Sequence, residues 1–190
     1  MGCSQSWVAI KSIAAESALN CLGFEIGASA EEAEATRFQG AQLPGGWYIV
    51  IIGRCSYESI RKEKLGELSV GRDVLAGDVE EHVMVSTAAG WRDGKEVWCV
   101  VHDAQQGINH LTTRGCPPAE FSAIRERQMA KQKAAGTDAD VDYIFDIPVD
   151  LTRAITGYHY SADLPGVDFD PLVKASPPKK ASWFHRLFRK

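Results

Sequence analysis

Residues 83–101 have the sequence VMVSTAAGWRDGKEVWCVV, and this stretch decides the fold. Asp93-Gly94 lies between two runs of residues that favour β-strands, which is the usual sequence of a type I′ turn. The stretch therefore predicts two antiparallel strands joined by a tight hairpin.

In a hairpin with a two-residue turn, the turn sets the register of the two strands. The expected pairs are Arg92 with Lys95, Trp91 with Glu96, Ala89 with Trp98, and Val85 with His102. This register places Trp91 and Trp98 on one face. The other face carries Ser86, Ala88 and Gly90 on the first strand, and these small side chains leave room for a helix to pack closely.

The run WYIVII at residues 47–52 consists of consecutive apolar, β-prone residues. It predicts a strand that is buried on both faces and therefore central in the sheet. Further strands are expected at residues 7–10, 24–26, 73–79, 108–113 and 141–145. Helices are expected at residues 13–22, from the segment after Cys55 to Leu68, at residues 119–134, and from Pro148 to Gly157.

These elements predict an α+β domain with a mostly antiparallel sheet of five to seven strands and helices packed mainly on one face. Residues 1–160 are expected to form this single domain. Residues 161–180 contain several prolines and are expected to be a linker. Residues 181–190 are expected to form a basic amphipathic tail helix.

The charge of the chain is distributed unevenly. Six of the 21 basic residues and none of the 25 acidic residues lie in residues 171–190, so residues 1–170 carry 15 basic and 25 acidic side chains, a net charge of −10. An acidic body has the wrong sign for nucleic acid, and we expect no nucleic-acid partner. A basic protein would be steered toward this body.

The cysteines and the N-terminal sequence indicate a cytoplasmic protein. The chain has five cysteines, an odd number, and no two of them form a CxxC motif. Neither a disulfide framework nor a zinc site is expected, and no cofactor is expected. Residues 1–6 lack the basic and apolar regions of a secretion signal, and no apolar run is long enough to span a membrane.

Cys55 is the candidate nucleophile. It follows the most apolar strand and precedes an expected helix, whose dipole would lower the pKa of a thiol at its N-terminus. The base would come from His82, His102 or His110, and Asp103 would orient it; in the first choice of catalytic residues, Cys55 acts with His102 and Asp103. The alternative interpretation is a half-buried structural cysteine.

A candidate metal site is formed by Glu80, His82, Asp103 and His110. Carboxylate and imidazole ligands suit zinc, manganese or iron. The predicted register brings His82 and Asp103 to the open end of the hairpin. The alternative interpretation is a solvated strand end with polar cross-strand pairs.

The N-terminal sequence MGCSQS matches the pattern for myristoylation of Gly2, and Cys3 could take a palmitoyl group. Two acyl chains hold a protein at a membrane, whereas one chain does not. A buried first strand beginning at Trp7 would argue against exposure of Gly2.

The tail carries a second candidate for membrane binding. On a helix, its aromatic and aliphatic side chains share one face and its basic side chains lie around the other, as in helices that bind membrane surfaces or partner grooves. The candidate residues are Trp183, Phe184, Arg186, Leu187, Phe188, Arg189 and Lys190. A helix docked on the acidic body and a disordered tail are the alternatives.

The sequence contains no P-loop, GxGxxG, GxSxG or HExxH motif. The first hypothesis is a non-catalytic protein-binding module, an adaptor or immunity-type inhibitor, whose acidic body engages a basic protein through Glu80, Glu81 and Asp103. The second is a peripheral membrane protein held on an anionic surface by its tail. The third is a thiol or metal enzyme that uses Cys55 or the His82, His102 and His110 cluster.

Overall fold

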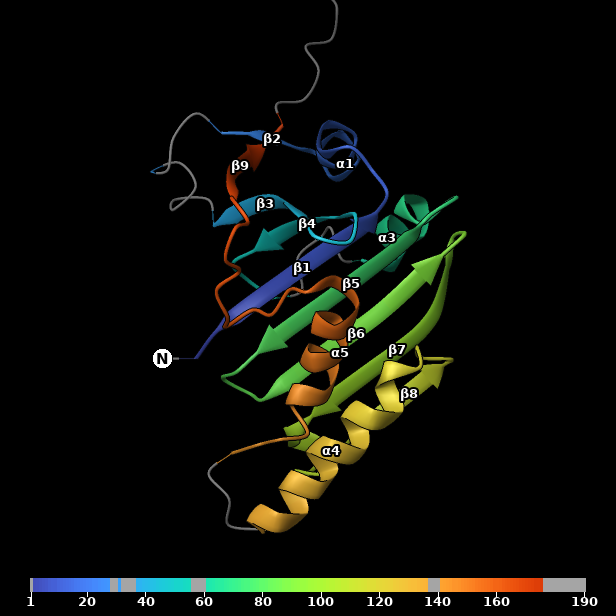
Figure 1. The fold of residues 1–190 in the computed structure, drawn as a ribbon, viewed down its shortest axis with the longest axis vertical. Helices are drawn as coiled ribbons and strands as arrows, with labels where there is room; N and C mark the ends of the chain where they lie inside the picture. The colour runs from blue at the N-terminus through green and yellow to red at the C-terminus, as the bar shows by residue number, and fades with distance from the viewer. Residues whose placement is uncertain (1, 28–30, 32–36, 56–60, 137–140, 176–190) are drawn as a thin grey trace, which may run out of the picture.

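The computed structural model describes residues 2–27, 31, 37–55, 61–136 and 141–175. Its strands are β1 (Ser4–Lys11), β2 (Phe24–Ile26), β3 (Phe38–Leu43), β4 (Trp47–Ile52), β5 (Asp73–Glu80), β6 (Val85–Arg92), β7 (Lys95–Asp103), β8 (Thr112–Gly115) and β9 (Asp170–Lys174). They form one nine-stranded sheet in the order β2-β9-β3-β4-β1-β5-β6-β7-β8 (Figure 1). All pairs are antiparallel, as expected, but the sheet is larger than the five to seven strands expected.

The described helices cover both faces of the sheet. They are α1 (Ala15–Leu22), α3 (Lys62–Leu68), α4 (Glu120–Ala135) and α5 (Asp146–Thr156), with a short 3-10 helix, η2 (Ala104–Gln106). The helices α4 and α5 pack into one core, and α1 and α3 pack into the other (Figure 1). The expectation of helices mainly on one face was therefore wrong. The reason lies in β4, whose six residues are all buried, because a strand buried on both faces needs a cover on each side.

The β6–β7 hairpin contains an irregularity that the predicted register did not include. Near the turn, Arg92 pairs with Lys95 and Trp91 with Glu96, as expected. The register then shifts by one residue, so that Gly90 faces Trp98 and Val85 faces Asp103. Ala89 and Val85 therefore do not have their expected partners, Trp98 and His102.

The shift is a β-bulge in which Val97 is the extra residue, and it exchanges the faces of β7 beyond that point. Trp98 lies in the core beneath α5, whereas Trp91 lies in the core beneath α3. Gly90 permits this arrangement, because a Cβ at that position would lie 2.2 Å from Trp98 Nε1. The small residues of β6 do receive a helix, and Ser86 Oγ donates to the carbonyl of Phe145 at 2.7 Å.

Two strands, β3 and β9, were not expected. β9 lies within residues 161–180, which were assigned to a linker, and Leu172 is fully buried there. Residues 108–113 form a strand only from Thr112 onward. The expected strand at residues 141–145 is a turn that leads into α5, because Asp142 accepts hydrogen bonds from the backbone N–H groups of Ile144 and Phe145.

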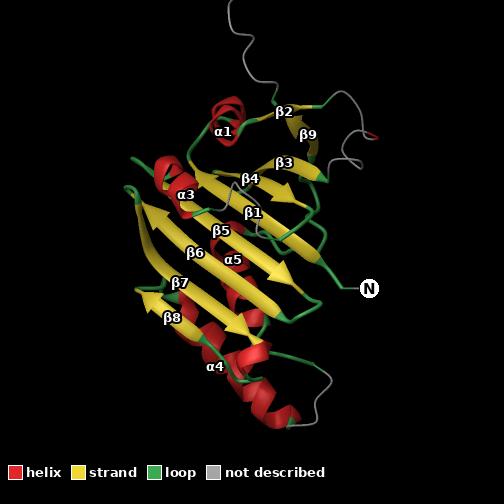
Figure 2. Cartoon of the chain, turned by 180° about the vertical axis from the view of Figure 1, so that it is seen from behind, coloured by secondary structure: helices red, strands yellow, loops and turns green. Residues whose placement is uncertain are grey.

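One part of the sheet has no helix over it within the described residues. On the face that carries α1 and α3, α3 covers β5, β6 and β7 only at their end near the β6–β7 turn (Figure 2). We call the rest of β5 to β8 on this side of the sheet the open face. No helix in the described part of the chain is both long and apolar enough to cross a membrane.

Candidate functional site

Two acidic residues share the rim of the open face. Glu80 of β5 pairs with Val85 of β6, and Val85 pairs with Asp103 of β7, so the two carboxylates stand two strands apart in one row. The parity of the strands places both on the side of Ala76 and Cys99, which belong to the α3 core. The structure thus brings together two of the three residues predicted to bind a partner.

Hydrogen bonds favour the ionised form of both of these carboxylates. His82 and Ser4 hydrogen bond to Glu80 and lower its pKa to about 2, with His82 Nδ1 at 2.5 Å from Glu80 Oε1. Asp103 accepts one hydrogen bond from Gln106 Nε2 at 2.7 Å and another from the backbone N–H of Gln105 at 3.0 Å. These bonds lower the pKa of Asp103. The rim is therefore negatively charged at neutral pH.

Glu81, the third predicted partner-binding residue, is used inside the molecule. It accepts hydrogen bonds from the backbone N–H of Cys3 and from the hydroxyl of Tyr160, both at 2.6 Å. These bonds tie the start of the chain and the segment after α5 to the β5–β6 turn. Each carboxylate oxygen of Glu81 thus has a donor within the molecule, and its contact with a partner stays a prediction.

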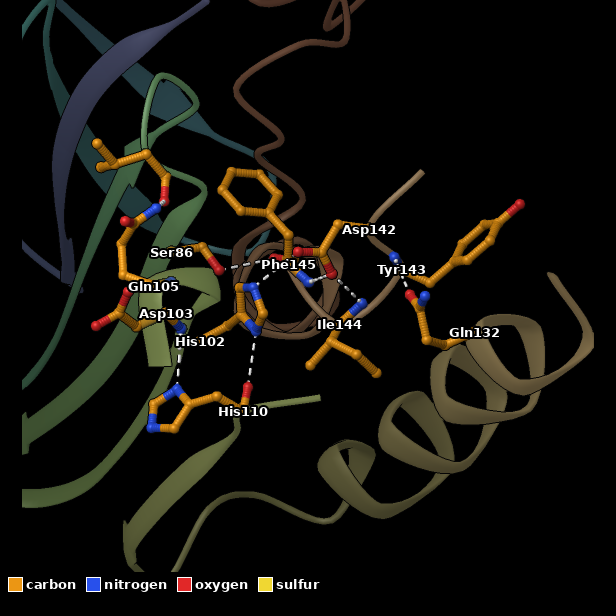
Figure 3. Close-up of polar contacts among 11 residues, drawn as sticks. Ser86, His102, Asp103, Gln105, His110, Gln132, Asp142, Tyr143, Ile144 and Phe145 are labelled. Atoms are coloured by element: carbon orange, nitrogen blue, oxygen red, sulfur yellow. Dashed lines mark hydrogen bonds and ion pairs between the residues drawn. The ribbon is translucent and has the colours of Figure 1, made fainter. Parts of the chain in front are cut away.

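A buried ion pair lies beneath α5 at the same end of the hairpin (Figure 3). His102 has no exposed surface, and its Nε2 lies 2.9 Å from Asp142 Oδ2, while its Nδ1 donates to the carbonyl of His110 at 2.7 Å. Asp142 Oδ1 accepts the backbone N–H groups of Ile144 and Phe145 at 3.0 and 3.1 Å. The pair joins β7 to the turn that begins α5.

The charged form of this pair is favoured by its hydrogen bonds. Burial lowers the pKa of His102, but the bonds to Asp142 and to the His110 carbonyl outweigh burial and leave the pKa raised. Burial raises the pKa of Asp142, but the bonds from His102, Phe145 and Ile144 leave it lowered. Because every polar atom of the pair has a protein partner, the geometry fits a structural clamp better than a catalytic base.

The four candidate metal ligands separate into two pairs. His82 bonds to Glu80, whereas His110 Nδ1 accepts the backbone N–H of Asp103 at 3.0 Å. Within the described ranges, no group of three or more His, Cys, Asp or Glu side chains could hold a metal ion. The metal hypothesis therefore receives no support from this geometry.

Cys55 is not placed as an activated nucleophile. Its thiol donates to the carbonyl of Val79, and its backbone N–H donates to Ser4 Oγ at 3.1 Å. Burial is the main cause that raises the pKa of Cys55 to about 12. A thiol with this pKa is almost wholly protonated at neutral pH. The hydrogen bonds of His82, His102 and His110 described above go to other groups.

This environment predicts low reactivity of Cys55. Cys21 and Cys116 are exposed, whereas Cys99 is buried. In the folded protein at pH 7.5, iodoacetamide is expected to modify Cys21 and Cys116 at least about tenfold faster than Cys55. Peptide mass spectrometry over a time course measures the four rates, and unfolded protein in urea serves as the control. Faster labelling of Cys55 than of Cys21 would restore the nucleophile hypothesis.

The two lipidation candidates lie against the body of the protein. Cys3 packs partly into the core beneath α5, and burial raises its pKa. A Cβ at Gly2 would lie 3.3 Å from both Glu81 and His82. Lipidation stays a prediction, and any acyl chain on Gly2 would start from this packed position. The candidate tail residues at 183–190 lie outside the described residues.

The open face contains a groove that the sequence did not reveal. The groove lies beside α3 and has a volume of about 170 Å³. Its floor is formed by Ala76, Ala89, Cys99 and Val101, and its wall by Leu65 and Trp91. Glu96 lies at its rim between Lys62 and Arg114, with N–O distances of 3.9 and 3.2 Å. We call it the α3 groove.

Comparison of the sequence with protein-family models and with curated proteins finds no match, and comparison of the fold with solved structures finds none.

Proposed function

We propose that the chain is a non-catalytic protein-binding module, an adaptor or immunity-type inhibitor, that engages a basic protein through the open face. The observation that carries this proposal is the part of β5–β8 over which no described helix packs, bordered by the ionised carboxylates of Glu80 and Asp103. In an antiparallel sheet, one face can remain free to meet water or a partner.

The side chains of the open face suit a protein partner. Val85, Thr87 and Val101 are partly exposed, and Thr112 and Arg114 are exposed. Interfaces of transient complexes combine such apolar patches with a polar rim. The rim charges would speed the encounter with a basic surface, and the apolar patch would slow dissociation.

The alternative chemistry has less support. The thiol of Cys55 has a raised pKa, and His102 already has partners on both ring nitrogens. A general base needs a nitrogen that can reach a substrate proton. A binding module needs no such group, which favours the binding proposal over the thiol enzyme.

Reversing the rim charges is expected to weaken partner binding. With Glu80→Lys and Asp103→Lys combined, like charges would face a basic partner, and we expect its Kd to rise by roughly tenfold or more. Tagged wild-type and variant proteins are used for affinity capture from the native cells with quantitative mass spectrometry. The Kd of the captured partner is then measured at two salt concentrations.

The matched control is Glu126→Lys with Asp163→Lys, which changes the charge equally at exposed positions on α4 and in the segment after α5. The control should capture as much partner as the wild type. Equal capture by the rim variant would place the interface elsewhere and contradict the proposal. Wild-type binding that does not weaken with salt would contradict the electrostatic part of the argument.

A further inference from the structure

Trp91, one of the residues that line the α3 groove, carries a buried hydrogen-bond donor without a partner among the described residues. Trp91 is 6% exposed and lines the groove, and its Nε1 has no hydrogen-bond partner in the part of the chain that the structure describes. A buried donor of this kind is unfavourable unless another group accepts its hydrogen bond. An acceptor from outside these residues would remove that cost.

The size and lining of the groove suit one apolar side chain. An apolar cavity of about 150 Å³ accommodates a single benzene ring. The α3 groove, at about 170 Å³, has a floor of small apolar residues and a wall formed by Leu65. A phenylalanine or leucine side chain fits this space, whereas a charged head group would lose its hydration there.

The charges around the groove give the occupant a direction. At the α3 end, Glu96 pairs with both Lys62 and Arg114, so this end has little unbalanced negative charge. At the other end, Asp78 lines the groove, and Glu80 follows two residues later on the same face of β5. Two residues of a strand span about 7 Å. A basic group near Glu80 and Asp103 would thus lie two positions from an apolar group in the groove.

We propose that the α3 groove receives one large apolar side chain from an extended segment of the basic partner, whose carbonyl oxygen accepts a hydrogen bond from Trp91 Nε1 and whose Lys or Arg two positions away lies at Glu80 and Asp103. This inference rests on the proposed function and names the chemistry of the segment recognised. Interface hot spots typically lie in well-packed, desolvated pockets near the centre of the interface.

Short peptides test the inference without the natural partner. The probe is acetyl-Phe-Ala-Lys-amide, and the matched controls are acetyl-Ala-Ala-Lys-amide and acetyl-Phe-Ala-Glu-amide. The titration follows the indole N–H resonances of ¹⁵N-labelled full-length protein, and Trp91→Phe assigns the Trp91 signal. We expect a downfield, saturable shift of the Trp91 signal with a Kd on the order of 1 mM. Both controls are expected to bind at least about fivefold more weakly.

Two variants locate the binding. Ala89→Leu fills the floor of the groove, and Thr87→Phe narrows its mouth from a partly exposed position. Both should abolish the shift of the Trp91 signal. If Ala89→Leu does not fold, Thr87→Phe remains as the test. No shift at about 10 mM probe, equal binding of acetyl-Ala-Ala-Lys-amide, or an unchanged shift in Thr87→Phe would overturn the inference.

The outcome also separates the two proposals. If Thr87→Phe captures the partner normally but the rim reversal does not, the groove inference fails and the proposed function stands. If the probe binds in the groove but the rim reversal leaves partner capture unchanged, the proposal that the open face binds a basic protein is contradicted. Loss of partner capture in both Thr87→Phe and the rim reversal supports both the proposed function and the groove inference.

Discussion

Replacing Asp142 with alanine is expected to lower the free energy of unfolding by about 3–5 kcal/mol near pH 6. The substitution leaves the imidazolium of His102 fully buried without its carboxylate. It also removes the acceptor of two backbone N–H groups, those of Ile144 and Phe145. Urea unfolding followed by circular dichroism measures the change, and Asp163→Ala at an exposed position is the control.

The pH dependence of this pair follows from the directions of its two pKa shifts. The pKa of His102 is raised above its ordinary 6.5, so its contribution is complete below pH 6.5 and is lost as the pH rises through the folded-state pKa. The pKa of Asp142 is lowered below 3.8, so its contribution is complete above pH 3.8 and is lost as the pH falls through the folded-state pKa. The pair therefore stabilises the fold most between these two values.

Asp142→Asn should convert the ion pair into a neutral hydrogen bond. His102 Nδ1 donates to the His110 carbonyl, so neutral His102 has a free lone pair on Nε2 that the new side-chain amide could meet as a donor. We expect this variant to be much less stable than wild type near pH 5.5 and to approach it above the folded-state pKa of His102. Asp146, whose pKa burial raises to about 6, titrates in both proteins and largely cancels in the difference.

The measurement is the difference in unfolding free energy between wild type and Asp142→Asn from pH 4 to pH 9. A difference that stays constant across this range would show that His102 does not change charge with Asp142. A loss below about 1 kcal/mol for Asp142→Ala would show that the pair is not the clamp between β7 and α5 that its burial indicates.

The fold could be predicted where local chemistry decides it. Asp93 and Gly94 both take positive φ values in the turn, as a type I′ hairpin requires. The run at Trp47–Ile52 is buried throughout. The faces of β7 could not be predicted, because the bulge at Val97 depends on the fit of the Trp98 indole over Gly90, which is a contact between strands. Periodicity along one strand contains no record of that contact.

The site could be predicted only in part, for a similar reason. Glu80 and Asp103 share a row because a bulge elsewhere in the hairpin moved Asp103 opposite Val85. The His102–Asp142 pair joins residues 40 positions apart. Asp142 had one local signal, since an aspartate before an expected helix often caps it, and the strand assigned to residues 141–145 obscured that signal. The residues that line the α3 groove come from five elements, α3 and β5 to β8, and form no pattern in the sequence.

Replacing Gly77 with alanine is expected to lower the free energy of unfolding by about 3 kcal/mol. Gly77 of β5 pairs directly with Trp7 of β1, and the buried Trp7 indole lies across it. A Cβ at Gly77 would lie 2.1 Å from Trp7 Cε2 and Cζ2. Since β1 and β6 hold β5 on both sides, the backbone cannot move away cheaply. Without this contact, glycine to alanine would stabilise the protein by about 0.4–1 kcal/mol through the unfolded state, so the two explanations differ in sign.

A double-mutant cycle assigns the loss to the indole. Trp7→Leu alone should destabilise the protein, because it leaves a cavity beside Tyr158, whose ring lies 5.6 Å from that of Trp7. In the Trp7→Leu background, Gly77→Ala should cost little, which gives a favourable coupling of about 2 kcal/mol or more. Circular dichroism is the readout, because the first substitution removes a tryptophan. Additive losses would mean that the indole moves aside, and that close packing over Gly77 does not fix Trp7 in the centre of the sheet.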